Sequence, residues 1–145
     1  MTELDEKCIN TIRFLAADAI EKAKSGHPGM PMGAAATAYT LWTRHLKHNP
    51  AHPGWMDRDR FVLSKGHGGV GHAVVLANKG YFDPELLKEF NHFNSPFGMH
   101  LDSLKARGVD ASTGSMGHGL SQAVGMALGA RVRKKPFHIY AVMGD

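Results

Sequence analysis

Apolar residues recur at helical spacing in the first part of the chain. In residues 3–24 the apolar positions are Leu4, Cys8, Ile12, Leu15, Ala19 and Ala23. Because this spacing puts them on one face of a helix, the pattern predicts an amphipathic helix that ends where Gly26 and Pro28 follow. A second, alanine-rich helix is predicted from about Gly33 to Lys47.

Short apolar segments alternate with glycine and proline in the middle of the chain. The letters RFVL, residues 60–63, are a very short apolar segment that runs into glycines. The letters AVVLANKG, residues 73–80, predict a helix that ends at its final glycine. Asp83 and Pro84 form a helix start signal, with Asp83 as the N-cap and Pro84 at the first helical position.

The last part of the chain predicts a long loop, a helix and a strand. Residues 91–119 are expected to be mostly loop, and a helix with small residues on one face is predicted over residues 120–135. The letters FHIYAVM, residues 137–143, form the only convincing strand, and their near-continuous apolar character is typical of a buried parallel strand. Helices that precede such a strand indicate an α/β fold, a parallel sheet flanked by helices.

Composition fits one folded domain and narrows its setting. The 145 residues are 43% apolar and 21% charged, and no apolar run approaches the roughly 20 residues that span a bilayer. The acidic start lacks the apolar core of a signal peptide, so a cytoplasmic protein without a membrane partner is expected. Cys8 is the only cysteine, which excludes a disulfide within the chain and a cysteine-based zinc site; we expect it to be a small buried hydrophobe.

The net charge of +4 bears on possible partners. Part of it lies in RVRKK, residues 131–135, which is either a nucleic-acid patch or a solvated helix end. The second interpretation is favoured because no basic stripe with interleaved aromatic residues accompanies it. The positive net charge is compatible with the attraction of phosphorylated small molecules. His45 and His48 have zinc-like helical spacing but no third ligand in view, so an exposed helix face is expected.

Three histidines beside glycine are candidate functional residues: His27 in SGHPG, His67 in SKGHGG and His100 in GMHLD. Glycine lets the backbone turn tightly and a ligand approach closely, and histidine donates or accepts protons near neutral pH. A single loop histidine is more often just exposed to solvent, and the spacing alone does not establish that the three converge.

Two further stretches are candidate ligand sites. Residues 112–120, STGSMGHGL, are a small-residue loop opening a helix, where backbone N–H groups can hold phosphates; a plain tight turn is equally consistent. Asp145 follows the carboxyl end of the predicted strand, where it could bind Mg²⁺ that holds a diphosphate or could cap a following helix. No serine elbow or Cys–His nucleophile pattern occurs, so if the chemistry needs a nucleophile, a cofactor must supply it.

Four stretches together resemble the amino-terminal part of transketolase. They are AIEKAKSGHPGMPMG, HNPAHPGWMDRDRFVLSKGHGG, STGSMGHGLSQAVGMALGA and VMGD. The resemblance is collinear and covers nearly the whole chain. Its final Gly-Asp resembles the opening of the thiamine diphosphate signature, Gly-Asp-Gly. The resemblance implies the thiamine diphosphate-binding fold, the cofactors thiamine diphosphate and Mg²⁺ (or Ca²⁺), and phosphorylated sugars as substrates.

The resemblance also implies residue roles. His27 is similar to the histidine that contacts the donor sugar and assists proton transfer, and His100 to one that contacts substrate hydroxyls. His67 is similar to the histidine that binds the cofactor diphosphate. Residues 114–116, which are Gly114, Ser115 and Met116, match the backbone segment around the cofactor's rings. Asp145 is similar to the first protein ligand of Mg²⁺.

The expected organisation is residues 1–145 as the amino-terminal part of a diphosphate-binding domain, truncated within the cofactor motif. The expected function is transfer of a two-carbon ketol group from a ketose phosphate to an aldose phosphate, with the isolated piece inactive. The expected partner is a second copy in a homodimer or, because the stretch before VMGD also resembles split forms, a separate carboxyl-terminal chain. The alternatives are another thiamine diphosphate enzyme, such as deoxyxylulose-phosphate synthase or dihydroxyacetone synthase, and a non-catalytic chain.

Overall fold

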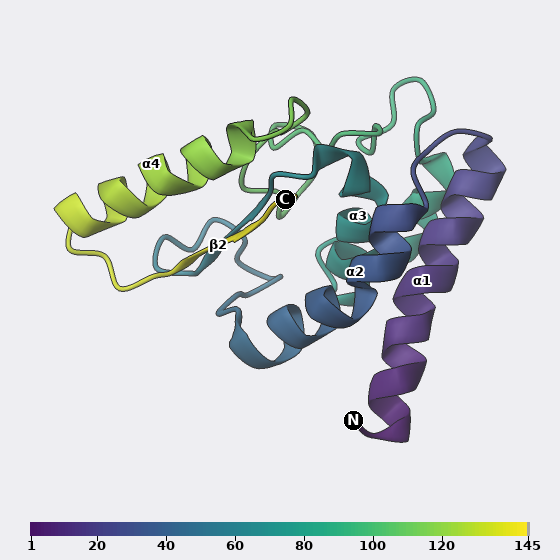
Figure 1. Cartoon of the computed structure of the whole chain (residues 1–145), viewed down its shortest axis with the longest axis horizontal. Coiled ribbons are helices and arrows are strands. Elements are labelled where there is room, and N and C mark those ends of the chain that lie inside the picture. The colour runs from purple at the N-terminus through teal and green to yellow at the C-terminus, as the bar shows by residue number, and fades with distance from the viewer. Residues whose placement is uncertain (145) are drawn as a thin grey trace.

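The computed structural model describes residues 1–144. Its elements in chain order are α1 (Glu3–Ala23), α2 (Gly29–Thr40), the π-helical turn η1 (Leu41–His45), β1 (Arg60–Leu63), the 3₁₀ turn η2 (Gly66–Gly68), α3 (Gly69–Asn78), the 3₁₀ helix η3 (Pro84–Glu89), α4 (His118–Val132) and β2 (Ile139–Val142). Figure 1 shows α1, α2 and α3 packed together on one side of the strands, with α4 on the other side. The predicted α/β class, a parallel sheet flanked by helices, is confirmed.

The first helix is fixed at its start by a reciprocal cap. The Thr2 backbone N–H donates to the Asp5 carboxylate at 2.7 Å, and the Asp5 N–H donates to the Thr2 hydroxyl at 3.2 Å. The Tyr39 hydroxyl of α2 also donates to Asp5 at 2.7 Å. The Thr2 backbone bond and then the Tyr39 bond hold the pKa of Asp5 well below its ordinary range. The cap therefore also joins α1 to α2.

The buried face of α1 agrees only in part with the prediction. Ile12 and Ala19 are buried as expected, but Leu4 is 67% exposed, whereas its neighbour Asp5 is buried against α2. Cys8 is partly buried rather than fully buried, which corrects the expectation of a buried small hydrophobe.

The second helix begins at Gly29, four residues before the predicted start at Gly33. Pro31 is buried within its first turn, where proline's missing N–H removes no helical hydrogen bond. The expectation of an exposed helix face is wrong for His48, which lies beyond η1 and is half-buried. Its Nε2 is 3.3 Å from the Trp42 carbonyl oxygen, and its Nδ1 is 3.4 Å from the Tyr81 hydroxyl.

A parallel pair of strands forms the sheet. Arg60 of β1 lies opposite Ile139 of β2, and Leu63 lies opposite Val142. The sequence predicted only the second strand, so β1 is a correction. It is too short for a period of two to be read, and its last three residues are all buried. The expectation of a buried second strand is also wrong, because β2 is half-buried along its length.

The other boundaries differ modestly from the predicted ones. The helix predicted from residue 73 begins at Gly69, and the segment that follows Asp83 is a 3₁₀ helix, with Asp83 accepting from the Glu85 N–H at 3.0 Å. The expected long loop ends at Gly117, and α4 begins at the next residue, His118. No helix in residues 1–144 has the length and apolar character that crossing a membrane requires.

Two aspartates hold the layers together at the start of β1. Asp59 accepts from the backbone N–H groups of Lys47, at 2.8 Å, and His138, at 2.7 Å. Asp110 accepts from the N–H of Phe61 at 2.9 Å and pairs with the Arg58 guanidinium at 2.5 Å. These contacts fix β1 against the segment before β2 and against the loop that leads to α4.

Candidate functional site

The strands end side by side at a hollow of about 320 Å³. Its lining comes from three segments: the residues after β1, the residues after β2 and the turn before α4. The lining residues are Ser64, Lys65, His67, Met116, Gly117, Met143 and Gly144. The carboxyl ends of parallel strands are where α/β proteins bind ligands, so the fold puts this hollow at a favoured position.

The three histidines that the sequence singled out lie near this end of the sheet. His67 is on η2, and its ring centroid is 5.4 Å from that of His27 in an edge-to-face contact. His100 lies beside the turn before α4, because a Cβ placed on Gly114 would be 3.8 Å from the His100 Cγ. The structure therefore brings together residues that are far apart in the sequence, which spacing alone could not establish. Their chemical roles stay predictions.

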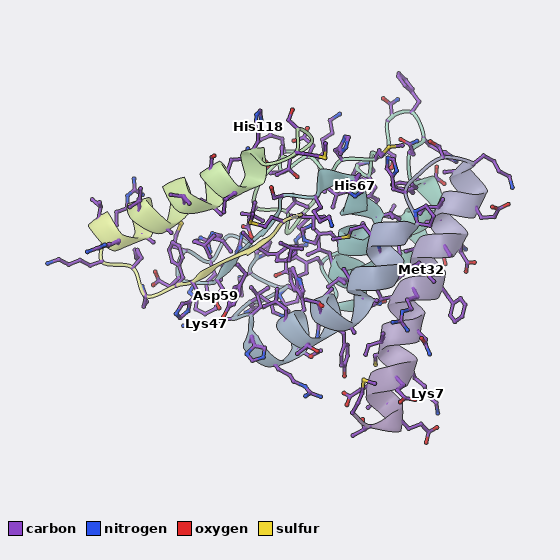
Figure 2. The ribbon with its side chains drawn as sticks, in the orientation of Figure 1. Lys7, Met32, Lys47, Asp59, His67 and His118 are labelled. Atoms are coloured by element: carbon purple, nitrogen blue, oxygen red, sulfur yellow. The ribbon has the colours of Figure 1, made fainter. Side chains whose placement is uncertain are left out.

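Burial and neighbouring positive charge act on His67 in the same direction. Burial lowers its pKa below the ordinary value, and the charges of His27, Lys65 and His100 lower it further. A histidine with a lowered pKa is neutral at pH 7, so one ring nitrogen can donate a hydrogen bond and the other can accept one. Figure 2 shows His67 on the turn that leads into α3.

Close backbone packing holds the turn before α4 against the end of β1. The Thr113 hydroxyl donates to the Leu63 carbonyl at 2.6 Å. A Cβ on Gly66 would lie 3.0 Å from the Thr113 backbone, and a Cβ on Gly119 would lie 2.6 Å from the Ser64 Cα. Neither approach leaves room for a side chain. Residues 114–116, the predicted ring-binding segment, are exposed beside this contact.

The described residues fit an anionic group such as a diphosphate. The Ser64 Oγ is buried and has no hydrogen-bond partner among residues 1–144. No side chain of the described residues caps the start of α4, where helix geometry leaves N–H groups without partners and favours negative charge. Lys65 and His67 add an ammonium and a ring N–H. The sequence reasoning named the loop that opens α4 as a possible phosphate site, but of these side chains it named only His67, although Ser64 and Lys65 stand in the quoted SKGHGG motif.

A metal site is not tested by the described residues. Asp145, the predicted Mg²⁺ ligand, lies outside them. Within residues 1–144 no group of three or more His, Cys, Asp or Glu side chains is arranged to hold a metal ion.

Comparison with known proteins decides the family. The family model described as "Transketolase, thiamine diphosphate binding domain" matches residues 4–141. The chain belongs to the transketolase family. The resemblance stated from the sequence is thereby confirmed, and the matched part is the amino-terminal, thiamine diphosphate-binding domain.

Relatives of known name are similar over nearly the whole chain. A transketolase of Geobacillus stearothermophilus is 48% identical over 153 aligned residues, which cover 98% of this chain and 23% of that protein. A transketolase of Bacillus subtilis is 50% identical over 132 residues, covering 90% of this chain and 20% of that protein. The chain thus spans less than a quarter of the length of these transketolases.

Solved transketolases share the fold. The chain superimposes on a Pichia stipitis transketolase complexed with sedoheptulose 7-phosphate with a TM-score of 0.94 and 36% identity, over 99% of this chain and 23% of that one. A Campylobacter jejuni transketolase gives a TM-score of 0.93 and 37% identity, over 100% of this chain and 24% of that one. The arrangement of helices and strands is therefore that of a transketolase thiamine diphosphate-binding domain over part of its length.

Proposed function

We propose that the chain provides the diphosphate-binding part of a transketolase, which moves a two-carbon ketol group from a ketose phosphate to an aldose phosphate. The observation that carries the proposal is the hollow at the ends of β1 and β2. There a buried hydroxyl without a partner among residues 1–144, an ammonium and a neutral histidine lie near the start of α4. Membership of the family supplies the cofactor class that this arrangement fits.

The cofactor supplies the carbon nucleophile when it is bound, which agrees with a sequence that contains no serine or cysteine nucleophile motif. In this proposal His67 binds the diphosphate, and the exposed backbone of residues 114–116 holds the rings. Asp145 is the proposed first protein ligand of Mg²⁺, or of Ca²⁺ in its place.

His27 and His100 act on the substrate in this proposal. The imidazole ring of His27 contacts that of His67, so the His27 ring is close to any ligand that His67 binds. His27 moves protons at the donor sugar, and His100 contacts substrate hydroxyls. Both histidines are exposed, as residues that meet a diffusing substrate must be.

The proposed substrates and partners follow the relatives. Pichia stipitis structures include complexes with sedoheptulose 7-phosphate, fructose 6-phosphate and xylulose 5-phosphate, and we assign sugar phosphates to this protein as well. A homodimer or a paired carboxyl-terminal chain completes the site in this proposal.

A product assay tests the function. The full natural protein that contains this sequence is incubated with xylulose 5-phosphate, ribose 5-phosphate, thiamine diphosphate and Mg²⁺. A seven-carbon ketose phosphate and a three-carbon aldose phosphate are the expected products, and neither should form without the cofactor. Turnover only with pyruvate as the donor would favour deoxyxylulose-phosphate synthase, and turnover only with formaldehyde as the acceptor would favour dihydroxyacetone synthase. No cofactor-dependent turnover would favour a non-catalytic chain.

A further inference from the structure

The side chain of Lys65 lies at the point where both strands end. Lys65 follows β1 by two residues, and it lines the hollow described above. A Cβ placed on Gly144, just after β2, would be 3.7 Å from the Lys65 Cε and 3.9 Å from its Nζ. The ammonium is therefore held beside the ends of both strands and does not extend away from the sheet.

Among residues 1–144, the hollow contains a positive charge and no negative charge. Lys65 forms no ion pair and no side-chain hydrogen bond with any of residues 1–144, whereas Lys135 pairs with Asp57 at 2.9 Å and Lys88 pairs with Glu85 at 2.5 Å. None of the residues that line the hollow in the described part of the chain is acidic. An ammonium among such neighbours attracts an anion, and the partly enclosed position strengthens the attraction relative to an exposed lysine.

Two further features of the hollow are suited to an anion. The Ser64 Oγ is buried without a partner among the described residues, and the Ser64 side chain is packed against the place where α4 begins. The start of α4 has no side-chain cap, and a 15-residue helix presents partial positive charge there. A donor without an acceptor, a helix start and an ammonium thus lie around one cavity.

We propose that Lys65 is a further affinity-determining residue of the cofactor site, whose ammonium pairs with the diphosphate. The inference rests on the proposed function and extends it to a residue that neither the sequence reasoning nor the family match assigns. Lysine binds phosphate as a compact point charge, so the pairing requires position but no strict geometry. Lys65 and the divalent cation then share the neutralisation of the diphosphate, and each lessens the dependence of binding on the other.

The test is a binding titration of the full natural protein, read from tryptophan fluorescence or heat. Lys65→Met removes the charge, Lys65→Arg keeps it, and Lys105→Met removes the same charge from an exposed position outside the hollow. The probes are thiamine diphosphate with Mg²⁺, thiamine alone and inorganic diphosphate. Because Lys65→Met removes a hydrogen bond to a charged group, it should weaken thiamine diphosphate binding about tenfold.

The other variants and probes distinguish an effect of the lost charge from an effect of altered packing. Lys65→Arg should stay near wild type, Lys105→Met should change nothing, and thiamine alone should bind all variants alike. The Lys65→Met variant should also need more Mg²⁺ for half-maximal binding. Unchanged thiamine diphosphate affinity in Lys65→Met would overturn the proposal. So would equal losses in Lys65→Arg and Lys65→Met together with a lowered melting temperature, because that pattern marks a packing role.

Failure of the proposed function gives a different result. If wild type binds inorganic diphosphate through Lys65 but does not bind thiamine diphosphate, the cofactor assignment is overturned and Lys65 remains an anion-binding residue. If wild type binds neither compound, both proposals are overturned.

Discussion

His72 of α3 is a base buried among aromatic rings. Its ring centroid is 4.8 Å from that of Phe61 and 5.9 Å from that of Trp42. Its Nε2 has no hydrogen-bond partner among residues 1–144, and burial alone lowers its pKa to about 3. The folded chain therefore keeps this ring neutral at any pH where the protein is expected to work.

The buried ring predicts a loss of stability in mild acid. Below pH 6.5 the unfolded chain binds a proton at His72 that the folded chain does not bind until pH about 3. The free energy of unfolding should thus fall as the pH drops from 6.5, by about 2 kcal/mol at pH 5 from this group, and the loss should stop near pH 3. Melting temperatures of wild type and His72→Leu between pH 7.5 and pH 5 measure it.

The leucine variant should lose less stability in acid than wild type. His52→Leu, at an exposed loop position, is the matched control and should keep the wild-type pH dependence. The account of His72 fails if His72→Leu and wild type lose the same stability over this range.

His27 is expected to act in catalysis and not in cofactor anchoring. General acid–base help contributes a factor of ~10²–10⁴ in rate, so His27→Ala should lower kcat/KM for the donor ketose by about that factor. The affinity for thiamine diphosphate should stay near wild type. Steady-state kinetics at saturating cofactor, with a melting curve, measures both effects. Wild-type turnover with a lowered melting temperature would show that His27 only packs the turn between α1 and α2.

At the scale of elements, the contact between α4 and β1 keeps the turn of residues 113–117 at the end of the sheet. Replacing glycine by alanine inside a helix ordinarily stabilises it by about 1 kcal/mol. At Gly119 the new Cβ would lie 2.6 Å from the Ser64 Cα, and this backbone atom cannot move aside as a flexible side chain would. We therefore expect Gly119→Ala to lower both the melting temperature and the affinity for thiamine diphosphate.

The same helix offers a matched control. A Cβ on Gly125 meets nothing within 4 Å among the described residues, so Gly125→Ala should leave the melting temperature unchanged or raise it. Equal melting temperatures for Gly119→Ala and wild type would contradict the close packing of α4 on β1.

The elements that could be predicted are those with a long pattern or a clear stop signal. The periodic residues 3–24 gave α1 almost to the residue, and the apolar run before Gly144 gave β2. The four residues of β1 are too few to show a period, and the second helix was predicted from about Gly33, although α2 begins at Gly29. In each case tertiary packing, which a local pattern does not contain, decides the boundary.

The sequence singled out some residues of the candidate site, but it could not place them relative to one another. The glycine-flanked histidines identified His27 and His67, whereas their ring contact depends on how α2 and η2 pack. Ser64 and Lys65 gave no separate signal, because an unpartnered hydroxyl and an unbalanced charge exist only once the chain has folded. The supporting contacts of Asp59 and Asp110 join segments distant in sequence and could not be foreseen.

At the scale of the whole molecule, α4 exposes an apolar stripe on its outer face. Its residues recur every fourth position and are 40% to 81% exposed: Leu120, Val124, Leu128 and Val132.

The chain spans less than a quarter of the length of related transketolases. We expect the 145-residue chain alone to show no ketol transfer above a blank without cofactor, while the full natural protein is active. Turnover by the purified chain would contradict this.

The central claim is that the hollow at the ends of β1 and β2 binds the diphosphate of thiamine diphosphate. The most direct test is a thiamine diphosphate titration, with Mg²⁺, of the full natural protein as wild type, His67→Ala and the exposed control His52→Ala. Because His67 is expected to hydrogen-bond a charged group, its loss should weaken binding roughly tenfold to a hundredfold. His52→Ala should bind like wild type. An unchanged titration for His67→Ala would contradict the account.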